Sequence, residues 1–105
     1  KIIGFREGTT SNKWFYSLEI NRGKINASMR EIITTLEGRG IQTRAIWGLI
    51  NEQAPYIQDE AYELEKAPYY ADRILNLPCS TQITDDEIEY VVKQIKEVLG
   101  ELQNA

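Results

Sequence analysis

The fold is decided by the stretch Gly38-Arg39-Gly40-Ile41-Gln42-Thr43-Arg44-Ala45-Ile46-Trp47, because a helix is expected to end at its start and a strand to begin within it. Either of its first two glycines can end a helix. The β-branched residues Ile41, Thr43 and Ile46 then favour a strand over 41–47. A strand that follows a helix so closely indicates mixed α and β structure.

The residues before this stretch predict a strand and then a helix. Over 14–20, alternate residues are apolar or aromatic, which is typical of a strand with one buried face and makes Trp14 a core candidate. Asn26 is the expected N-cap of the helix. The helix has an apolar stripe at the spacing i, i+3, i+4, i+7, formed by Met29, Ile32, Ile33 and Leu36. The short run 2–5 is expected to be an edge strand or the segment that leads into the sheet.

The second half of the chain predicts two short helices, a strand and a long helix. We expect a helix over 59–66 and another that starts at Pro68, where a missing N–H costs nothing. Residues 74–77 read as a buried strand stopped by Pro78. Thr84 and Glu87 form a capping box. The apolar stripe of the last helix then consists of Ile88, Val91, Val92, Ile95, Leu99 and Leu102.

This order of elements predicts a single α+β domain with two layers. With 105 residues the chain has the length of one ordinary domain. Helices with one apolar stripe each should pack on one face of a small, mostly antiparallel sheet of about three or four strands.

Composition excludes several classes of function. A net charge of −4 argues against nucleic-acid binding, which needs a basic face. No apolar run is long enough to span a membrane. A single cysteine, Cys79, and no histidine leave no conventional zinc site, and they fit a reducing, cytoplasmic setting. The carboxylates of 85–87 are expected to favour the positive end of the helix dipole rather than to bind a metal.

Arg44 and Trp47 are the first candidates for ligand contacts. The planar guanidinium of Arg44 can reach a phosphate or a carboxylate, or it can pair with a surface acid such as Glu37. Trp47 can stack on a sugar or a base, or it can fill the core or an interface. Both alternatives stay open for each residue. The six lysines lie in polar or terminal settings, so none is expected to be catalytic.

Four segments together resemble the C-terminal region of the DegT/DnrJ-type aminotransferases that use pyridoxal phosphate. These segments are Gly38 to Trp47, Gln53-Ala54-Pro55-Tyr56, Ala71 to Pro78, and Ile83-Thr84-Asp85-Asp86-Glu87-Ile88. The resemblance is strongest to the branch that acts on 4-keto nucleotide sugars of the legionaminic-acid and bacillosamine type. It covers nearly all of this chain but only the last part of such an enzyme.

The resemblance implies a C-terminal domain whose reacting centre lies elsewhere. The cofactor-binding lysine and the other pyridoxal phosphate contacts would belong to a large N-terminal domain that this sequence does not include, and the full-length enzyme would be a homodimer. Because the sequence begins at Lys1 and not at a methionine, we expect it to be part of a longer polypeptide. The whole enzyme would move an amino group from glutamate to a nucleotide sugar in the synthesis of cell-surface polysaccharides.

The resemblance also bears on single residues. Many family members carry a histidine near the substrate where this chain has Asn51, so hydrogen bonding is the most that this side chain could contribute. Gln53 and Tyr56 could form the polar rim of a pocket, and Asn12 could line the same edge. The other tyrosines of 56–70 are expected to contact the large domain or a second subunit. The alternative function is a non-catalytic α+β module that binds a ligand or mediates dimerisation.

Overall fold

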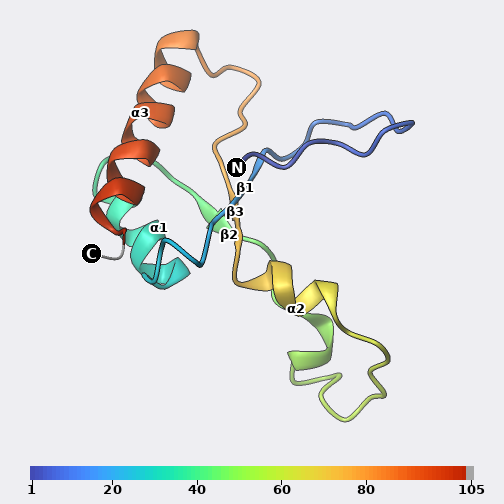
Figure 1. Cartoon of the computed structure of the whole chain (residues 1–105). Helices are drawn as coiled ribbons and strands as arrows, with labels where there is room; N and C mark the ends of the chain where they lie inside the picture. Colours follow the sequence, from blue (N-terminus) through green and yellow to red (C-terminus); the bar gives the residue numbers. More distant parts are fainter. Residues whose placement is uncertain (104–105) are drawn as a thin grey trace.

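Three short strands form one antiparallel sheet, in the order β1, β3, β2, in the computed structural model, which describes residues 1–103 (Figure 1). The strands span Ser17–Glu19 (β1), Arg44–Ala45 (β2) and Ile74–Asn76 (β3). Leu75 of the central strand lies between Leu18 and Ala45. The predicted small antiparallel sheet is therefore confirmed, as is the strand before Pro78.

Pro78 explains why β2 begins later than the sequence predicts. Arg44 and Ser17 both lie opposite Asn76, so continuing either register by two residues would bring Gln42 or Phe15 opposite Pro78. Proline has no N–H to donate to a neighbouring strand. The β2–β3 ladder therefore stops before Gln42. On the β1 side, Leu77 N–H still donates to the Tyr16 carbonyl at 2.9 Å. Of the expected strands over 14–20 and 41–47, only the central residues form regular strand.

Helix α1 spans Met29–Glu37 and begins with a capping box. The backbone N–H of Glu31 donates to Ser28 Oγ at 3.2 Å, and the N–H of Ser28 donates to Glu31 Oε2 at 2.7 Å. The expected N-cap at Asn26 is thus wrong by two residues, because the reciprocal pair at Ser28 satisfies two backbone donors at once. Gly38 ends the helix as predicted, and Gly40 then turns the chain with a φ of +77°.

Helix α3 spans Asp85–Glu101 and confirms the predicted capping box. Thr84 N–H donates to Glu87 Oε2 at 2.8 Å, and Glu87 N–H donates to Thr84 Oγ1 at 3.3 Å. The carboxylate of Glu87 accepts hydrogen bonds from the Thr84 N–H and from the Thr84 hydroxyl, and these bonds lower the pKa of Glu87 below the ordinary value of 4.5. Glu87 therefore acts as part of the helix cap.

Helices α1 and α3 pack together on one face of the sheet (Figure 1). Their shared core contains Leu18 and Leu75 from the sheet, Ile32 and Leu36 from α1, and Ile95 and Val98 from α3. Two members of the predicted α3 stripe do not join it, since Ile88 and Val92 are 44% and 43% exposed. Val98, which the predicted stripe omits, is fully buried.

Arg39 fastens the turn after α1 to helix α3. Its guanidinium donates to Gln94 Oε1 at 2.9 Å and forms ion pairs with Glu97 at 3.1 Å and Glu101 at 2.7 Å. The bond to Glu101 is the main reason that the pKa of Arg39 is raised. In return, Tyr90 Oη donates to the Arg39 carbonyl at 2.9 Å. This network fixes the direction in which the chain enters β2.

The segment between β2 and β3 projects from the end of the sheet away from α3 (Figure 1). It contains a 3-10 turn over Ile50–Glu52 (η1) and a short helix over Lys66–Ala71 (α2). Helix α2 begins at Lys66, two residues before the expected start at Pro68, so Pro68 lies within its first turn. The predicted helix over 59–66 is wrong: Glu63 has a φ of +46°, and the polar stretch has no packed face to stabilise a helix of two turns.

The described chain is more extended than its length requires. Its radius of gyration is 15.5 Å, against about 13 Å for a compact domain of this size. Its accessible surface is 8369 Å², whereas a compact monomer of the same mass exposes roughly 6,000 Å². The N-terminal arm, which consists of the residues before β1, and the segment between β2 and β3 both extend away from helices α1 and α3 and account for this shape (Figure 1). Both carry exposed aromatic residues, so the isolated chain displays surface suited to burial against other protein.

Candidate functional site

Arg44 and Trp47 line one shallow hollow beside the outer strand β2. The hollow measures about 400 Å³, and Phe15, Thr43 and Asn76 contribute to the same wall. Trp47 is 72% exposed, so it is not a core residue. Its ring remains available to a ligand or to another protein surface.

Three aromatic rings gather next to Arg44. Trp14 stacks on Phe15 with ring centroids 4.7 Å apart, and Trp47 meets the two rings edge-on at 6.0 and 6.2 Å. Trp14 is 60% exposed, so the expectation that it joins the core is wrong. Phe15 was not among the predicted site residues, because strict alternation along a strand places it on the face opposite Trp14.

The backbone before the rings departs from a regular strand. Lys13 adopts a left-handed conformation with a φ of 53°, which interrupts the strand pattern before Trp14. Asn12 Oδ1 accepts from the Trp14 N–H at 3.1 Å, and Ser11 Oγ accepts from the Lys13 N–H at 2.9 Å. Asn12 therefore shapes the turn that leads into Trp14 and Phe15.

Arg44 has no ion-pair partner within residues 1–103. The ion pairs of this part of the chain involve Arg22, Arg39 and Arg73, and the anticipated alternative of a pair with Glu37 does not form. Beside it, the buried hydroxyl of Thr43 has no hydrogen-bond partner among the described residues. A free guanidinium next to exposed rings is suited to an anionic ligand that also has a flat face.

The other predicted residues lie in separate places. Asn51 is half-buried in η1 and shares a second hollow of about 530 Å³ with Tyr56. Gln53 is exposed and donates weakly to the Gly48 carbonyl at 3.4 Å. Asn12 lines a third hollow, next to α3. The structure thus brings Arg44 and Trp47 together, and Asn51 and Tyr56 together, but it does not join the six residues into one pocket.

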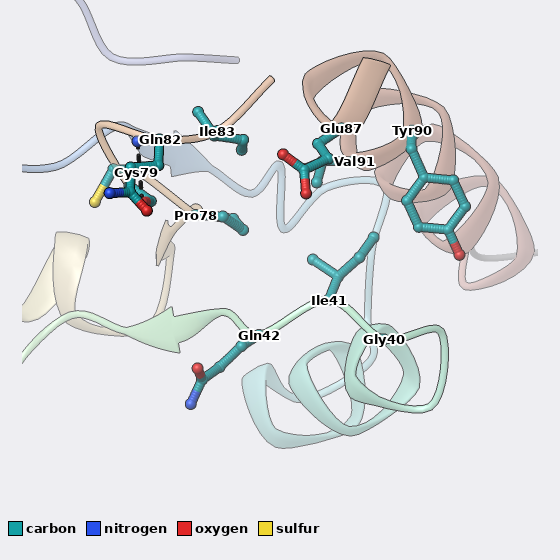
Figure 2. Close-up of a pocket in the computed structure, with 11 residues that line it drawn as sticks. Gly40, Ile41, Gln42, Pro78, Cys79, Gln82, Ile83, Glu87, Tyr90 and Val91 are labelled. Atoms are coloured by element: carbon teal, nitrogen blue, oxygen red, sulfur yellow. Dashed lines mark hydrogen bonds between the residues drawn. The ribbon is translucent and has the colours of Figure 1, made fainter. Parts of the chain in front are cut away.

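A further hollow of about 660 Å³ lies between the turn after α1, the β3–α3 connection and the start of α3 (Figure 2). None of the six predicted residues lines it. Two of its polar side chains are already engaged, because Glu87 caps α3 and Tyr90 binds the Arg39 carbonyl. Cys79 is a free, half-buried thiol at its edge. The sequence pattern gives no reason to assign a reaction to this hollow.

The described residues do not fit pyridoxal phosphate by themselves. All six lysines are exposed, so no lysine amine of the chain is desolvated in a pocket, the setting that makes such an amine reactive. Within residues 1–103, no group of three or more His, Cys, Asp or Glu side chains could hold a metal ion. No described helix is long and apolar enough to cross a membrane.

The sequence profile of the DegT/DnrJ/EryC1/StrS aminotransferases matches residues 2–96, which is most of the chain. The chain belongs to this aminotransferase family. No curated protein matches the sequence significantly. The family resemblance given by the sequence segments is therefore confirmed at this level, whereas the branch within the family is not settled by the match.

Solved structures agree with the fold. The aminotransferase TlmJ from Streptoalloteichus hindustanus superposes with a TM-score of 0.79 and 20% sequence identity, over 97% of this chain and 26% of TlmJ. Spr1654 from Streptococcus pneumoniae, assigned as a sugar aminotransferase and solved in its PMP form, gives a TM-score of 0.70 and 22% identity, over 84% of this chain and 22% of Spr1654. The chain thus spans about a quarter of the length of these two proteins.

Proposed function

We propose that this chain is the C-terminal domain of a pyridoxal phosphate-dependent aminotransferase acting on a nucleotide sugar. The whole enzyme transfers the amino group of glutamate to the 4-keto carbon of the sugar, releasing 2-oxoglutarate, in the synthesis of cell-surface polysaccharide. The legionaminic-acid and bacillosamine branch is the proposed assignment within the family. The enzyme is proposed to work in the cytoplasm as a homodimer.

The observation that carries the proposal is family membership combined with the exposure of every lysine. A family profile extends over residues 2–96, yet no lysine of the chain lies in a pocket. The cofactor and its lysine are therefore assigned to a large domain outside this sequence. On its own, the chain is expected to be inactive.

The role of the chain is to position the substrate and to exclude water. Arg44 would bind a phosphate oxygen through its unpaired guanidinium, and Trp47 would cover a flat part of the same ligand. Asn51 and Tyr56 line the neighbouring hollow, where they would donate hydrogen bonds to sugar hydroxyls or to the large domain. Gln53 and Asn12 are proposed as rim residues only. Holding substrate in one orientation is a recognised contribution to rate.

The test is a coupled assay on two proteins, the full-length product of the parent reading frame and residues 1–105 alone. Both are given glutamate, pyridoxal phosphate and a set of 4-keto nucleotide sugars, and 2-oxoglutarate and aminated sugar are measured. We expect turnover by the full-length protein and none by residues 1–105. Failure of the full-length protein with every sugar, together with tight binding of one sugar by residues 1–105, would instead support a non-catalytic ligand-binding module.

A further inference from the structure

An apolar groove runs along the side of α3 that the core does not use. It measures about 530 Å³. Ile88 and Val92 are half-exposed here although they continue the apolar stripe of the helix. The apolar lining of the groove includes Ile2, Tyr16, Leu77, Ile88, Val91 and Val92, and Cys79 and the polar residues Asn12, Lys13, Ser80 and Thr81 also line it. The apolar stripe of α3 is therefore wider than the part of the helix that the core covers. The uncovered part of such a stripe needs a second apolar neighbour.

The outer edge of β1, next to the groove, is already occupied. Ile3 N–H donates to the Ser17 carbonyl at 2.9 Å, and Glu19 N–H donates to the Lys1 carbonyl at 2.8 Å. The N-terminal residues therefore already occupy the outer side of β1. A strand added to β1 itself would find no backbone partners, and the groove offers side chains to a partner. A helix that lays its apolar face into a groove is bound through such side chains.

The position of the N-terminus indicates where such a helix comes from. Ile2 lines the groove itself, and the amino group of Lys1 donates to the Glu19 carbonyl at 3.0 Å. The N-terminus accordingly lies beside β1 (Figure 1). Any residues before Lys1 would therefore leave the domain at the rim of the groove. Gln103, by contrast, bridges to Ile25 at the far end of α3, and a 17-residue helix is about 25 Å long.

We propose that this groove holds an amphipathic helix of the same polypeptide, from the segment that precedes Lys1. The inference rests on the proposed function, in which the chain is one domain of a longer enzyme. The solved relatives are about four times as long as this chain, so they contain ample sequence to supply the helix. A second copy of the chain fits less well, because a twofold contact would set one hollow against another and leave a void.

The experiment measures the accessibility of one position in the groove. Val92→Cys and Lys93→Cys are each made in a Cys79→Ser background, both in the full-length protein and in residues 1–105, and their rates of maleimide labelling are compared. Lys93 is exposed and adjacent, so it serves as the matched control. In the full-length protein we expect position 92 to label at least about tenfold more slowly than position 93, since a docked helix must open before the thiol can react. In residues 1–105 the two rates should be similar.

Each other outcome identifies a different occupant. Equal rates at positions 92 and 93 in the full-length protein would overturn the inference. Protection of position 92 in residues 1–105 that grows with protein concentration, together with a dimeric mass, would assign the groove to a second copy and also overturn it. The visible absorbance of bound pyridoxal phosphate is recorded on the same full-length samples. Bound cofactor with an unprotected position 92 would refute the docked helix alone, and a protected position 92 without cofactor would refute the proposed function alone.

Discussion

At the scale of single residues, Arg44 carries the clearest functional expectation. Its guanidinium lacks an ion-pair partner within residues 1–103 and lies beside the exposed Trp47 ring. In the full-length enzyme, Arg44→Lys should lower kcat/KM for the nucleotide sugar by about tenfold or more, because an ammonium cannot reproduce a two-point contact with phosphate. Steady-state kinetics should place the effect on the KM for the sugar and leave the KM for glutamate unchanged. Arg30→Lys, at an exposed position of α1, is the control, and an equal effect at both positions would contradict the assignment.

A second expectation at this scale concerns pH. Hydrogen bonds from Ser28 and from Thr84 lower the pKa values of Glu31 and Glu87, so each carboxylate stabilises the fold while it is ionised. This stabilisation is complete above the ordinary glutamate pKa and is lost as the pH falls through the lowered values. Glu87→Gln keeps the geometry of the capping box but cannot titrate. Urea unfolding between pH 7 and pH 3 should therefore show a flatter acid decline for Glu87→Gln, and a slope equal to that of the unsubstituted chain would count against the cap.

At the scale of elements, the two faces of α3 give a matched comparison. Val98→Ala removes a fully buried side chain and should cost about 2 kcal/mol of unfolding free energy in residues 1–105. Val92→Ala, the same change at a half-exposed position of the same helix, should cost under about 0.5 kcal/mol there. Chemical denaturation of both variants measures the difference. Similar losses of unfolding free energy in the two variants would contradict the packing of α3 on the core through the face that carries Val98.

The elements that were predictable are those whose signal is local. The capping box at Thr84 and the apolar spacing of Ile32 and Leu36 fix two helices without any knowledge of distant residues. The start of β2 depends instead on Pro78, more than 30 residues away in sequence, through a register that the sequence does not display. The stripe of α3 predicts an apolar face, but only the fold shows that Val92 lies outside the core.

The candidate site was less predictable than the fold for a related reason. Arg44 and Trp47 are close in sequence and lie on one strand and its exit, so their shared hollow could be anticipated. Phe15 joins them although alternation along a strand would place it on the face opposite Trp14, and the left-handed backbone of Lys13 shows that the regular strand does not extend back through this segment. Asn51 lies in a different hollow because the chain turns at η1, and no spacing rule gives that turn.

At the scale of the whole molecule, the excess surface has a direct consequence. Residues 52–65 are exposed throughout, and Tyr62 is 83% exposed. Limited chymotrypsin digestion of residues 1–105 should therefore cut first after Tyr62, since cleavage favours exposed and locally unfolded backbone. Mass spectrometry identifies the site, and Tyr62→Ala should move the first cut to a neighbour within the same segment. A first cut inside α1 or α3 would show that this segment is not the exposed part of the chain.

At the same scale, we propose that this domain belongs to an aminotransferase whose reacting lysine lies in another part of the polypeptide. The most direct measurement is borohydride reduction after mixing protein with one equivalent of pyridoxal phosphate, followed by intact mass analysis and peptide mapping. We expect one covalent pyridoxyl group per subunit in the full-length protein, on a lysine outside residues 1–105, and only scattered, substoichiometric labelling of residues 1–105 alone. Stoichiometric labelling of a single lysine within residues 1–105 would contradict the claim.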